Sequence, residues 1–175
     1  CFTNKERIAN VNLYTPDGTT YWGIPANLIE NLRQTPIEEV EAYTFVADPN
    51  QRSYNIEITE GKELPYEDLY TMEVDSSYNK VFTPQIVQGS WETASNTPNS
   101  VILTRSLARK IFGNDESPIG KRMISTQRLS TSPSTTPRTG GISYTIQAVI
   151  EDIPLNTSLS FLQQIDMLIL NDSEG

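Results

Sequence analysis

The sequence predicts an α+β fold in which a strand–helix–strand lobe is followed by a mostly β lobe with few short helices. Three observations support this class. Several segments alternate apolar and polar residues, as half-buried strands do. Two short stripes have apolar residues at helical spacing. Residues with turn chemistry separate these segments. We place the α/β lobe at residues 1–50 and the mostly β lobe at residues 51–175.

The N-terminal lobe begins with a predicted strand, Ile8 to Tyr14, followed by the turn sequence Thr15-Pro16-Asp17-Gly18 and a short return strand over 19–23. Pro25 suits a first helical turn, and Leu28, Ile29 and Leu32 form an apolar stripe after it. Thr35-Pro36 ends this helix. The segment that follows, Ile37 to Val46, is a predicted strand with Val40 and Ala42 facing inward. Tyr43, Phe45 and Val46 are further inward candidates.

The second lobe begins with two predicted strands, Ser53 to Thr59 and Leu69 to Val74, on either side of Glu60-Gly61. In the first of them Tyr54, Ile56 and Ile58 share one face. Ser76 to Phe82 fits a single helical turn that is capped by Ser76 or Asp75 and directs Tyr78, Val81 and Phe82 to the core.

A further strand and helix are predicted from Ser100 onward. Ser100 to Leu103 is a short buried strand, and Thr104 caps a helix near 105–112. Gly113 is placed for a left-handed C-cap. Lys121 to Ile124 starts another strand.

The C-terminal third contains the clearest strand pattern of the chain, over Ile142 to Ile150. We expect Ile142, Tyr144, Ile146, Ala148 and Ile150 to share one face there. Phe161 to Leu170 is apolar, and its pattern leaves helix and strand open. Between these strands, Ser125 to Gly140 has nine Ser or Thr among sixteen residues, a composition that predicts a mobile hairpin tip or long loop and a candidate contact region for a partner.

Composition excludes several functions. The 175 residues contain no histidine and one cysteine, so Ser-His-Asp and Cys-His catalytic groups, His-ligated metals and internal disulfides are impossible within this chain. Thirteen basic against 22 acidic residues give a net charge of −9. Because such a chain repels phosphate backbones, we predict no nucleic-acid partner.

Other candidate chemistry has a simpler explanation in each case. The acidic clusters Asn114-Asp115-Glu116 and Asp48-Pro49-Asn50 lack a calcium-loop pattern and fit solvated turns. Glu38, Glu39, Glu41 and the pair Glu67-Asp68 fit a solvated surface better than a catalytic carboxylate pair. An aromatic platform built from Trp22, Trp91, Tyr14, Tyr21 and Tyr78 is an alternative to core packing. We predict no enzyme activity, no metal and no cofactor.

The ends and hydropathy of the chain leave its anchoring open. Cys1 has two interpretations: the lipid-bearing residue of a mature bacterial lipoprotein, or the point at which a longer protein was cut. The longest apolar run is Met167 to Leu170, far shorter than the roughly 20 residues of a membrane-spanning helix.

Several motifs together resemble a known family. They are Glu6-Arg7-Ile8-Ala9-Asn10-Val11, Val74 to Phe82 followed by Val87-Gln88-Gly89, the continuous run Asn99 to Gly113, Ser117-Pro118-Ile119-Gly120-Lys121, and Tyr144 to Pro154 followed by Asn156 and Ser158. In order and spacing the chain resembles the periplasmic core domain of MacB-type ABC transporter permeases, the FtsX-like family. The motif residues carried over are structural: Gly89, Ser100, Thr104, Gly113, Pro118, Gly120, Asp152 and Pro154.

The resemblance implies a non-catalytic ectodomain fragment on the periplasmic side of the bacterial inner membrane. It implies that the domain relays ATP-driven motion of membrane helices to a periplasmic partner or substrate. The implied partners are the rest of the permease chain, a second permease subunit, a cytoplasmic ATPase subunit and a periplasmic adaptor. The alternative that the residues leave open is a free-standing periplasmic or lipoprotein binding module.

Overall fold

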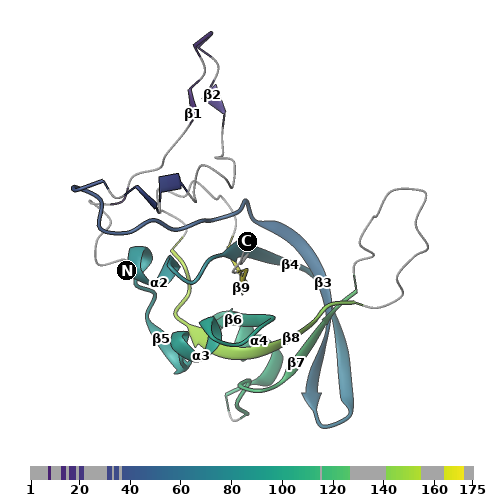
Figure 1. Cartoon of the computed structure of the whole chain (residues 1–175). Helices are drawn as coiled ribbons and strands as arrows, with labels where there is room; N and C mark the ends of the chain where they lie inside the picture. Colours follow the sequence, from purple (N-terminus) through teal and green to yellow (C-terminus); the bar gives the residue numbers. More distant parts are fainter. Residues whose placement is uncertain are drawn as a thin grey trace.

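The computed structural model describes residues 8, 13–14, 16–18, 20–21, 31–32, 34–35, 37–114, 116–126, 141–154 and 164–171. Its strands and helices, in chain order, are β1 (Leu13–Tyr14), β2 (Thr20–Tyr21), β3 (Asn50–Thr59), β4 (Lys62–Val74), α2 (Tyr78–Phe82), β5 (Ile86–Gly89), α3 (Trp91–Ser95), β6 (Ser100–Thr104), α4 (Arg105–Phe112), β7 (Arg122–Ser125), β8 (Ser143–Ile150) and β9 (Met167–Leu170). This mixed sheet with a few short helices confirms the predicted α+β class (Figure 1).

Seven of the strands form one sheet in the order β5-β8-β6-β9-β4-β3-β7. Because β7 also pairs with β8, the strands β8, β6, β9, β4, β3 and β7 close into a ring. β5 lies outside this ring and pairs with the last residues of β8. The β4–β9 and β6–β8 pairs are parallel, while the other pairs are antiparallel. A closed ring leaves few strand edges free, which protects a β-rich domain from edge-to-edge association.

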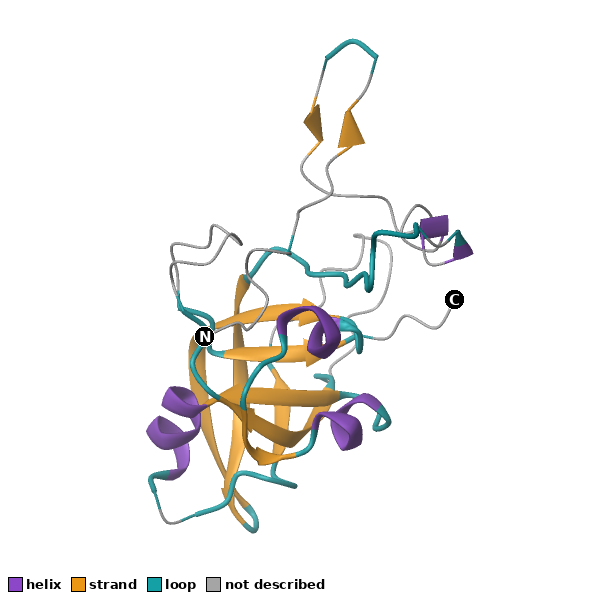
Figure 2. Cartoon of the chain, turned by 90° about the vertical axis from the view of Figure 1, so that its left-hand side faces the viewer, coloured by secondary structure: helices purple, strands orange, loops and turns teal. Residues whose placement is uncertain are grey.

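The ring is packed on both sides. One apolar cluster takes side chains from all six ring strands and from α4, among them Tyr54, Leu69, Leu103, Met123, Ile146 and Met167. A second cluster lies on the opposite face of β4, β6, β8 and β9 and is covered by α2 and α3 through Tyr78, Phe82, Trp91 and Ala94. Every residue of β6 and β9 is buried, so these strands have no alternating pattern in the sequence. Figure 2 shows short helices placed around the strands.

The predicted common face of β8 is wrong, because the strand changes faces at a bulge. Val101 of β6 pairs with Ile146, whereas the next residue, Ile102, pairs with Ala148. Gln147 is therefore an extra residue. Tyr144 and Ile146 belong to the first cluster together with Val149, and Ala148 and Ile150 belong to the second.

The N-terminal lobe differs most from prediction. The hairpin is confirmed by pairing of β1 with β2, and these two strands stand apart from the main sheet (Figure 1). The strand predicted over Ile37 to Val46 is wrong: only Val46 forms a bridge, to Val74, and Val40 is 39% exposed. β3 already occupies this edge of β4 up to Thr71, so only the end of the segment reaches a partner.

Of the predicted helix, residues 31, 32 and 34 are helical and the rest lies outside the described residues. Most of the strand predicted over Ile8 to Tyr14 also lies outside them. The lobe boundary at residue 50 stays a prediction.

In the second lobe the predicted helical turn is α2, the predicted helix near 105–112 is α4, and the open C-terminal segment ends in strand β9. Strand β5 and helix α3 were not predicted, because four and five residues are too few to show a period. Gly113 has a positive φ of 75°, but its ψ of −154° is extended instead of left-handed helical. Most of the predicted Ser125 to Gly140 loop, residues 127–140, lies outside the described part.

Candidate functional site: the seam beside β8 and the end of β4

The motif residues gather along one edge of β8. One edge pairs with β6 from Thr145 to Ile150 around the bulge at Gln147. The opposite edge pairs first with β7, over 143–145, and then with β5, over 148–150. Between these two partners, backbone groups of Ile146 and Gln147 are satisfied by loops. Gly120 N donates to Ile146 O at 2.8 Å, Ile146 N donates to Lys121 O at 2.9 Å, and Ser90 N lies 3.4 Å from Gln147 O. The loops thus complete the ladder where two strands meet.

Glycines are required for two different reasons at the seam, which is the place where β7 and β5 meet beside Ile146 and Gln147 of β8. Gly89 has φ +73°, and a Cβ there would lie 2.1 Å from Gln147 O, so a side chain is excluded both by backbone conformation and by contact. Gly120 has φ +84° and open space around it. It is the third residue of a turn in which Lys121 N donates to Pro118 O at 3.1 Å, and Pro118 is buried beneath that turn.

The N-terminus of α4 is held by two motif residues from different elements. Thr104 Oγ1 accepts from Leu107 N at 3.4 Å, as predicted, and donates to Asp166 O at 2.9 Å. Asp152, which follows β8, accepts from Ser106 N at 2.9 Å and from Ser106 Oγ at 2.5 Å. The two residues therefore join α4 to the ends of β6, β8 and β9.

The remaining motif residues also serve the backbone. Ser100 is fully buried, and its hydroxyl donates to Thr97 O at 2.7 Å. Pro154 is half-buried and lies in the irregular segment that follows β8. Apart from Pro154, for which only partial burial is observed, the motif residues of the described part thus contact the protein's own backbone or core.

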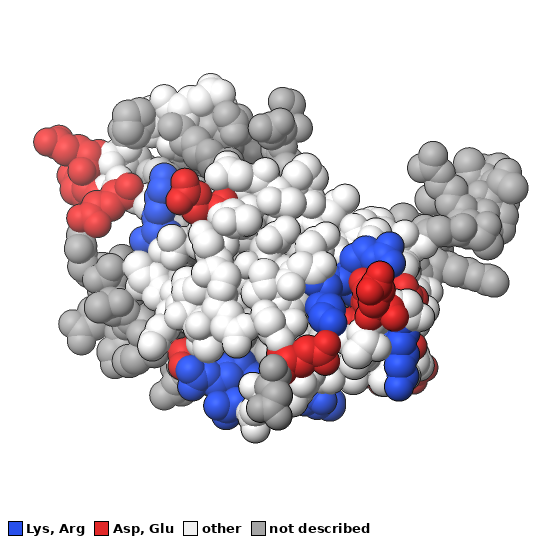
Figure 3. Space-filling view, turned by 90° about the horizontal axis from the view of Figure 1, so that it is seen from below, with Lys and Arg blue, Asp and Glu red and all other residues white. Residues whose placement is uncertain are grey.

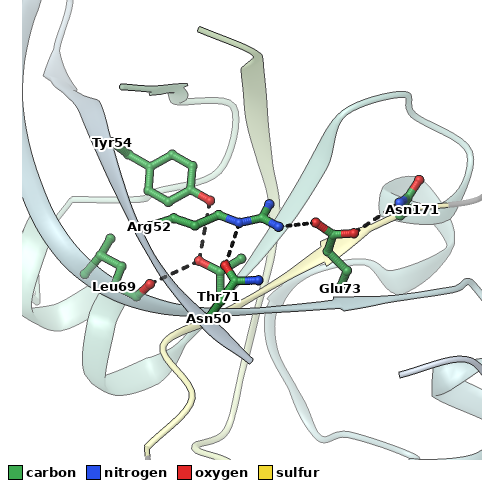
Figure 4. Close-up of polar contacts among 7 residues, drawn as sticks. All are labelled: Asn50, Arg52, Tyr54, Leu69, Thr71, Glu73 and Asn171. Carbon is green, nitrogen blue, oxygen red and sulfur yellow. Dashed lines mark hydrogen bonds and ion pairs between the residues drawn. The ribbon is translucent and has the colours of Figure 1, made fainter. Parts of the chain in front are cut away.

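A separate polar group lies at the end of β4 (Figure 4). The Arg52 guanidinium forms an ion pair with Glu73, and Arg52 Nε donates to Asn50 Oδ1 at 2.7 Å. Asn171 Nδ2, just after β9, donates to the other oxygen of Glu73 at 3.2 Å. Burial opposes the charge of Arg52, but the hydrogen bond and the charge of Glu73 outweigh it, and the pKa of Arg52 is raised. Glu73 thereby links β3, β4 and the chain after β9.

One carboxylate is destabilised by its surroundings. Burial and, to a smaller degree, the nearby charge of Asp152 raise the pKa of Asp166, although Tyr70 N donates to it at 2.9 Å and Lys110 partly offsets the effect. Both carboxylates accept backbone N–H groups, which accounts for their positions at the ends of strands.

Where they are described, the residues of the alternative aromatic platform and of the acidic clusters have structural roles or lie on the surface. Tyr78 and Trp91 are buried and stacked with ring centroids 5.8 Å apart, so they belong to the core and not to a surface platform. Glu116 pairs with Lys121 at 2.8 Å, and Glu38, Glu39, Glu67 and Asp68 are exposed. No group of three metal-binding side chains occurs among the described residues. An open hollow of about 340 Å³ lies between Val40–Tyr43 and α2.

Sequence reasoning missed the polar group at the end of β4. Arg52, Glu73 and Asn171 come from three distant segments, and no local spacing connects them. The predicted cap of α2, Ser76 or Asp75, is wrong, because the helix begins after Ser77 and has no side-chain cap bond. The Asp75 carboxylate accepts from Ser77 N at 3.0 Å, and it also accepts from Thr44 Oγ1 and Phe45 N. Within the described residues, no helix has both the length and the apolar content of a membrane span.

A closed ring of strands in which the described motif glycines, turns and caps bond to the protein's own backbone defines a β-rich structural domain. The family follows from comparison with known proteins. A model of the MacB-like periplasmic core domain matches residues 2–171, and the chain belongs to this family. It is accordingly a periplasmic domain of an ABC transporter permease.

Solved structures similar to this chain come from the same group of proteins. A domain of a permease protein from Porphyromonas gingivalis is 23% identical, with a TM-score of 0.49, and the match covers 74% of this chain and 50% of that one. The periplasmic region of MacB from Actinobacillus actinomycetemcomitans is 17% identical, with a TM-score of 0.38 and coverage of 74% and 59%. The extracellular domain of the noncanonical ABC-type transporter YknZ from Gram-positive bacteria is 15% identical, with a TM-score of 0.46 and coverage of 86% and 74%.

The chain thus spans about half the length of the first of these structures and about three-fifths of the second. The comparison with curated proteins found no match.

Proposed function

We propose that this domain relays ATP-driven movement of a permease's membrane helices to a periplasmic partner or substrate, and that it performs no catalysis itself. The observation that carries the proposal is the family match over residues 2–171. The packed strand ring supports it, because a sheet with apolar clusters on both faces moves as a rigid body and transmits displacement without deforming.

The proposed partners follow from the same assignment. They are the membrane helices of the permease chain, a second permease subunit, a cytoplasmic ATPase subunit and a periplasmic adaptor. The motif residues Gly89, Ser100, Thr104, Gly113, Pro118, Gly120, Asp152 and Pro154 act in this proposal as scaffold residues that keep the relay stiff.

The test measures movement in the full-length permease reconstituted with its ATPase in nanodiscs. With other cysteines replaced, a spin label at Glu60→Cys, in the exposed turn between β3 and β4, reports the distance between the two subunits' domains. A label at Glu92→Cys on α3 reports a second distance. We expect both distance distributions to change on ATP addition, and not with an ATPase subunit that cannot bind ATP.

Distributions that stay the same with and without ATP at both positions would overturn the relay. A mature protein that carries this domain without any membrane helix would instead establish the free-standing periplasmic or lipoprotein module.

A further inference from the structure

Residues 44–47, which we name the strap, lie along the edge of β4 just beyond the start of β3. They belong to the dark blue segment that leads into β3 in Figure 1. Val46 forms an antiparallel bridge with Val74. On either side of the bridge, Ala47 N donates to Glu73 O at 2.9 Å and Asp75 N lies 3.3 Å from Phe45 O. The strap thus extends the edge of the sheet by one short backbone ladder.

A single buried carboxylate supports this short ladder. Asp75 is 5% exposed, and its oxygens accept from Thr44 Oγ1 at 2.7 Å, Phe45 N at 3.0 Å and Ser77 N at 3.0 Å. Two of these three donors come from the strap. Because a buried charge is stable only when donors surround it, releasing the strap would leave Asp75 short of partners. The carboxylate therefore holds the strap to the start of α2.

The other edge of β4, at Glu73 and Val74, holds the last strand. β9 runs parallel to β4 from Thr71↔Met167 to Val74↔Leu170, and Asn171 N donates to Val74 O at 2.9 Å. The Asn171 side chain also binds Glu73, which is paired with Arg52 (Figure 4). Glu73, Val74 and Asp75 consequently contact the segment that enters the ring and the segment that leaves it.

We infer that Glu73 to Asp75 form a junction at which Asp75 latches the strap, so that the chain entering the ring and the chain leaving it move as one body. This inference rests on the proposed function, in which displacement reaches the domain through these two segments. Asp75 is a positioning residue: it acts by keeping the strap on β4. Loss of the latch would let the entering segment move without displacing β9 and the ring.

The first test measures backbone hydrogen exchange in the full-length permease. In Asp75→Asn we expect exchange of the strap amides to rise about tenfold or more, with β6 amides unchanged. Thr44→Val should cause a smaller rise and Thr44→Ser almost none, which keeps the test informative if Asp75→Asn folds poorly. The matched control is Asp152→Asn, which removes a carboxylate from the α4 cap and should leave the strap protected. Unchanged strap exchange in both Asp75→Asn and Thr44→Val would overturn the latch.

The second test asks whether the latch transmits movement. Val46 and Val74 form a non-hydrogen-bonded pair, in which Cα atoms lie about 4.5 Å apart, so Val46→Cys with Val74→Cys suits a disulfide once Cys1 is replaced by Ser. We expect Asp75→Asn to reduce the ATP-driven distance change at Glu60, and the disulfide to restore it in the oxidised but not the reduced protein. The label at Glu60→Cys is attached through a thioether bond after the disulfide has formed, so that reduction leaves it in place.

The outcomes separate the two proposals. If the wild-type permease shows no ATP-driven change, the relay fails, while the exchange result still decides the latch. If the wild type moves and Asp75→Asn moves equally, the junction is wrong and the relay stands.

Discussion

At the scale of single residues, the contact between Gly89 and Gln147 decides how β8 is paired. The bulge at Gln147 directs its carbonyl toward the place where a side chain of residue 89 would be. The absence of a Cβ lets β5 approach and lets Ser90 N reach the same oxygen. One glycine therefore permits the change from β7 to β5 along the edge of β8.

Gly89→Ala should be strongly destabilising. A Cβ at 2.1 Å from a backbone oxygen forces the backbone to shift, and φ +73° adds strain. We expect the free energy of unfolding to fall by about 3 kcal/mol or more, measured by urea denaturation.

Gly61→Ala is the matched control, because Gly61 has φ +75° with nothing within 4 Å of its Cβ position. Its cost should be about 1 kcal/mol, from conformation alone. Equal losses in the two variants would show that the contact with Gln147 contributes nothing.

At the scale of elements, the long strand β4 contains an irregularity of its own. Arg52 pairs with Leu69 but Tyr54 pairs with Tyr66, so one residue of β3 lies opposite the two residues Glu67 and Asp68. Asp68 has φ +56°, the left-handed conformation that glycine adopts in bulges of this kind. Its side chain is exposed, so the strain is not offset by packing.

Asp68→Gly should therefore stabilise the domain. Relief of the left-handed strain exceeds the entropy cost of glycine, and we expect a gain of about 0.5 kcal/mol, or about 1–2 °C in Tm. Asp68→Ala removes the same charge but keeps a Cβ, so it should lower Tm. A rise in both variants would assign the effect to charge and contradict the backbone explanation.

Element prediction from sequence succeeded where the signals are local. Thr104 caps α4, four apolar residues form its buried stripe, and Gly113 ends it, all within ten residues. The strand predicted over 37–46 is wrong because its apolar residues carry no information about β3 already covering the edge of β4. The prediction that one set of alternating β8 residues shares a face is wrong for the same reason. The bulge at Gln147 depends on β6 and β5, which are distant in sequence.

The candidate site divides in the same way. Motif residues such as Thr104 and Gly120 could be named because capping and turn chemistry act within a few residues. The junction of Glu73 to Asp75 could not be predicted from the sequence, because its contacts join distant segments. Asp75 binds Thr44, and Glu73 binds Arg52 and Asn171, across separations of 21 to 98 residues. Only the closed ring brings these segments together.

At the scale of the whole molecule, the dominant electrostatic feature is net charge. Basic side chains lie next to acidic ones over the face in Figure 3, and four ion pairs are formed within the described residues, such as Arg105–Glu151 at 2.6 Å. Exposed pairs of this kind each contribute at most about 1 kcal/mol. The uncompensated charge of −9 acts on the entire chain and repels itself.

Salt should consequently stabilise the domain, because screening weakens the net repulsion more than it weakens the few exposed pairs. We expect Tm to rise by a few degrees between about 20 mM and about 300 mM NaCl, over which the screening length falls several-fold. The control variant Glu38→Gln/Glu39→Gln/Asp48→Asn removes three exposed carboxylates and brings the charge from −9 to −6. It should start at a higher Tm and respond less to salt. A Tm that falls with salt in the wild type would mean that ion pairs such as Arg52–Glu73 outweigh the repulsion, and that the rigidity of the ring depends on its paired charges.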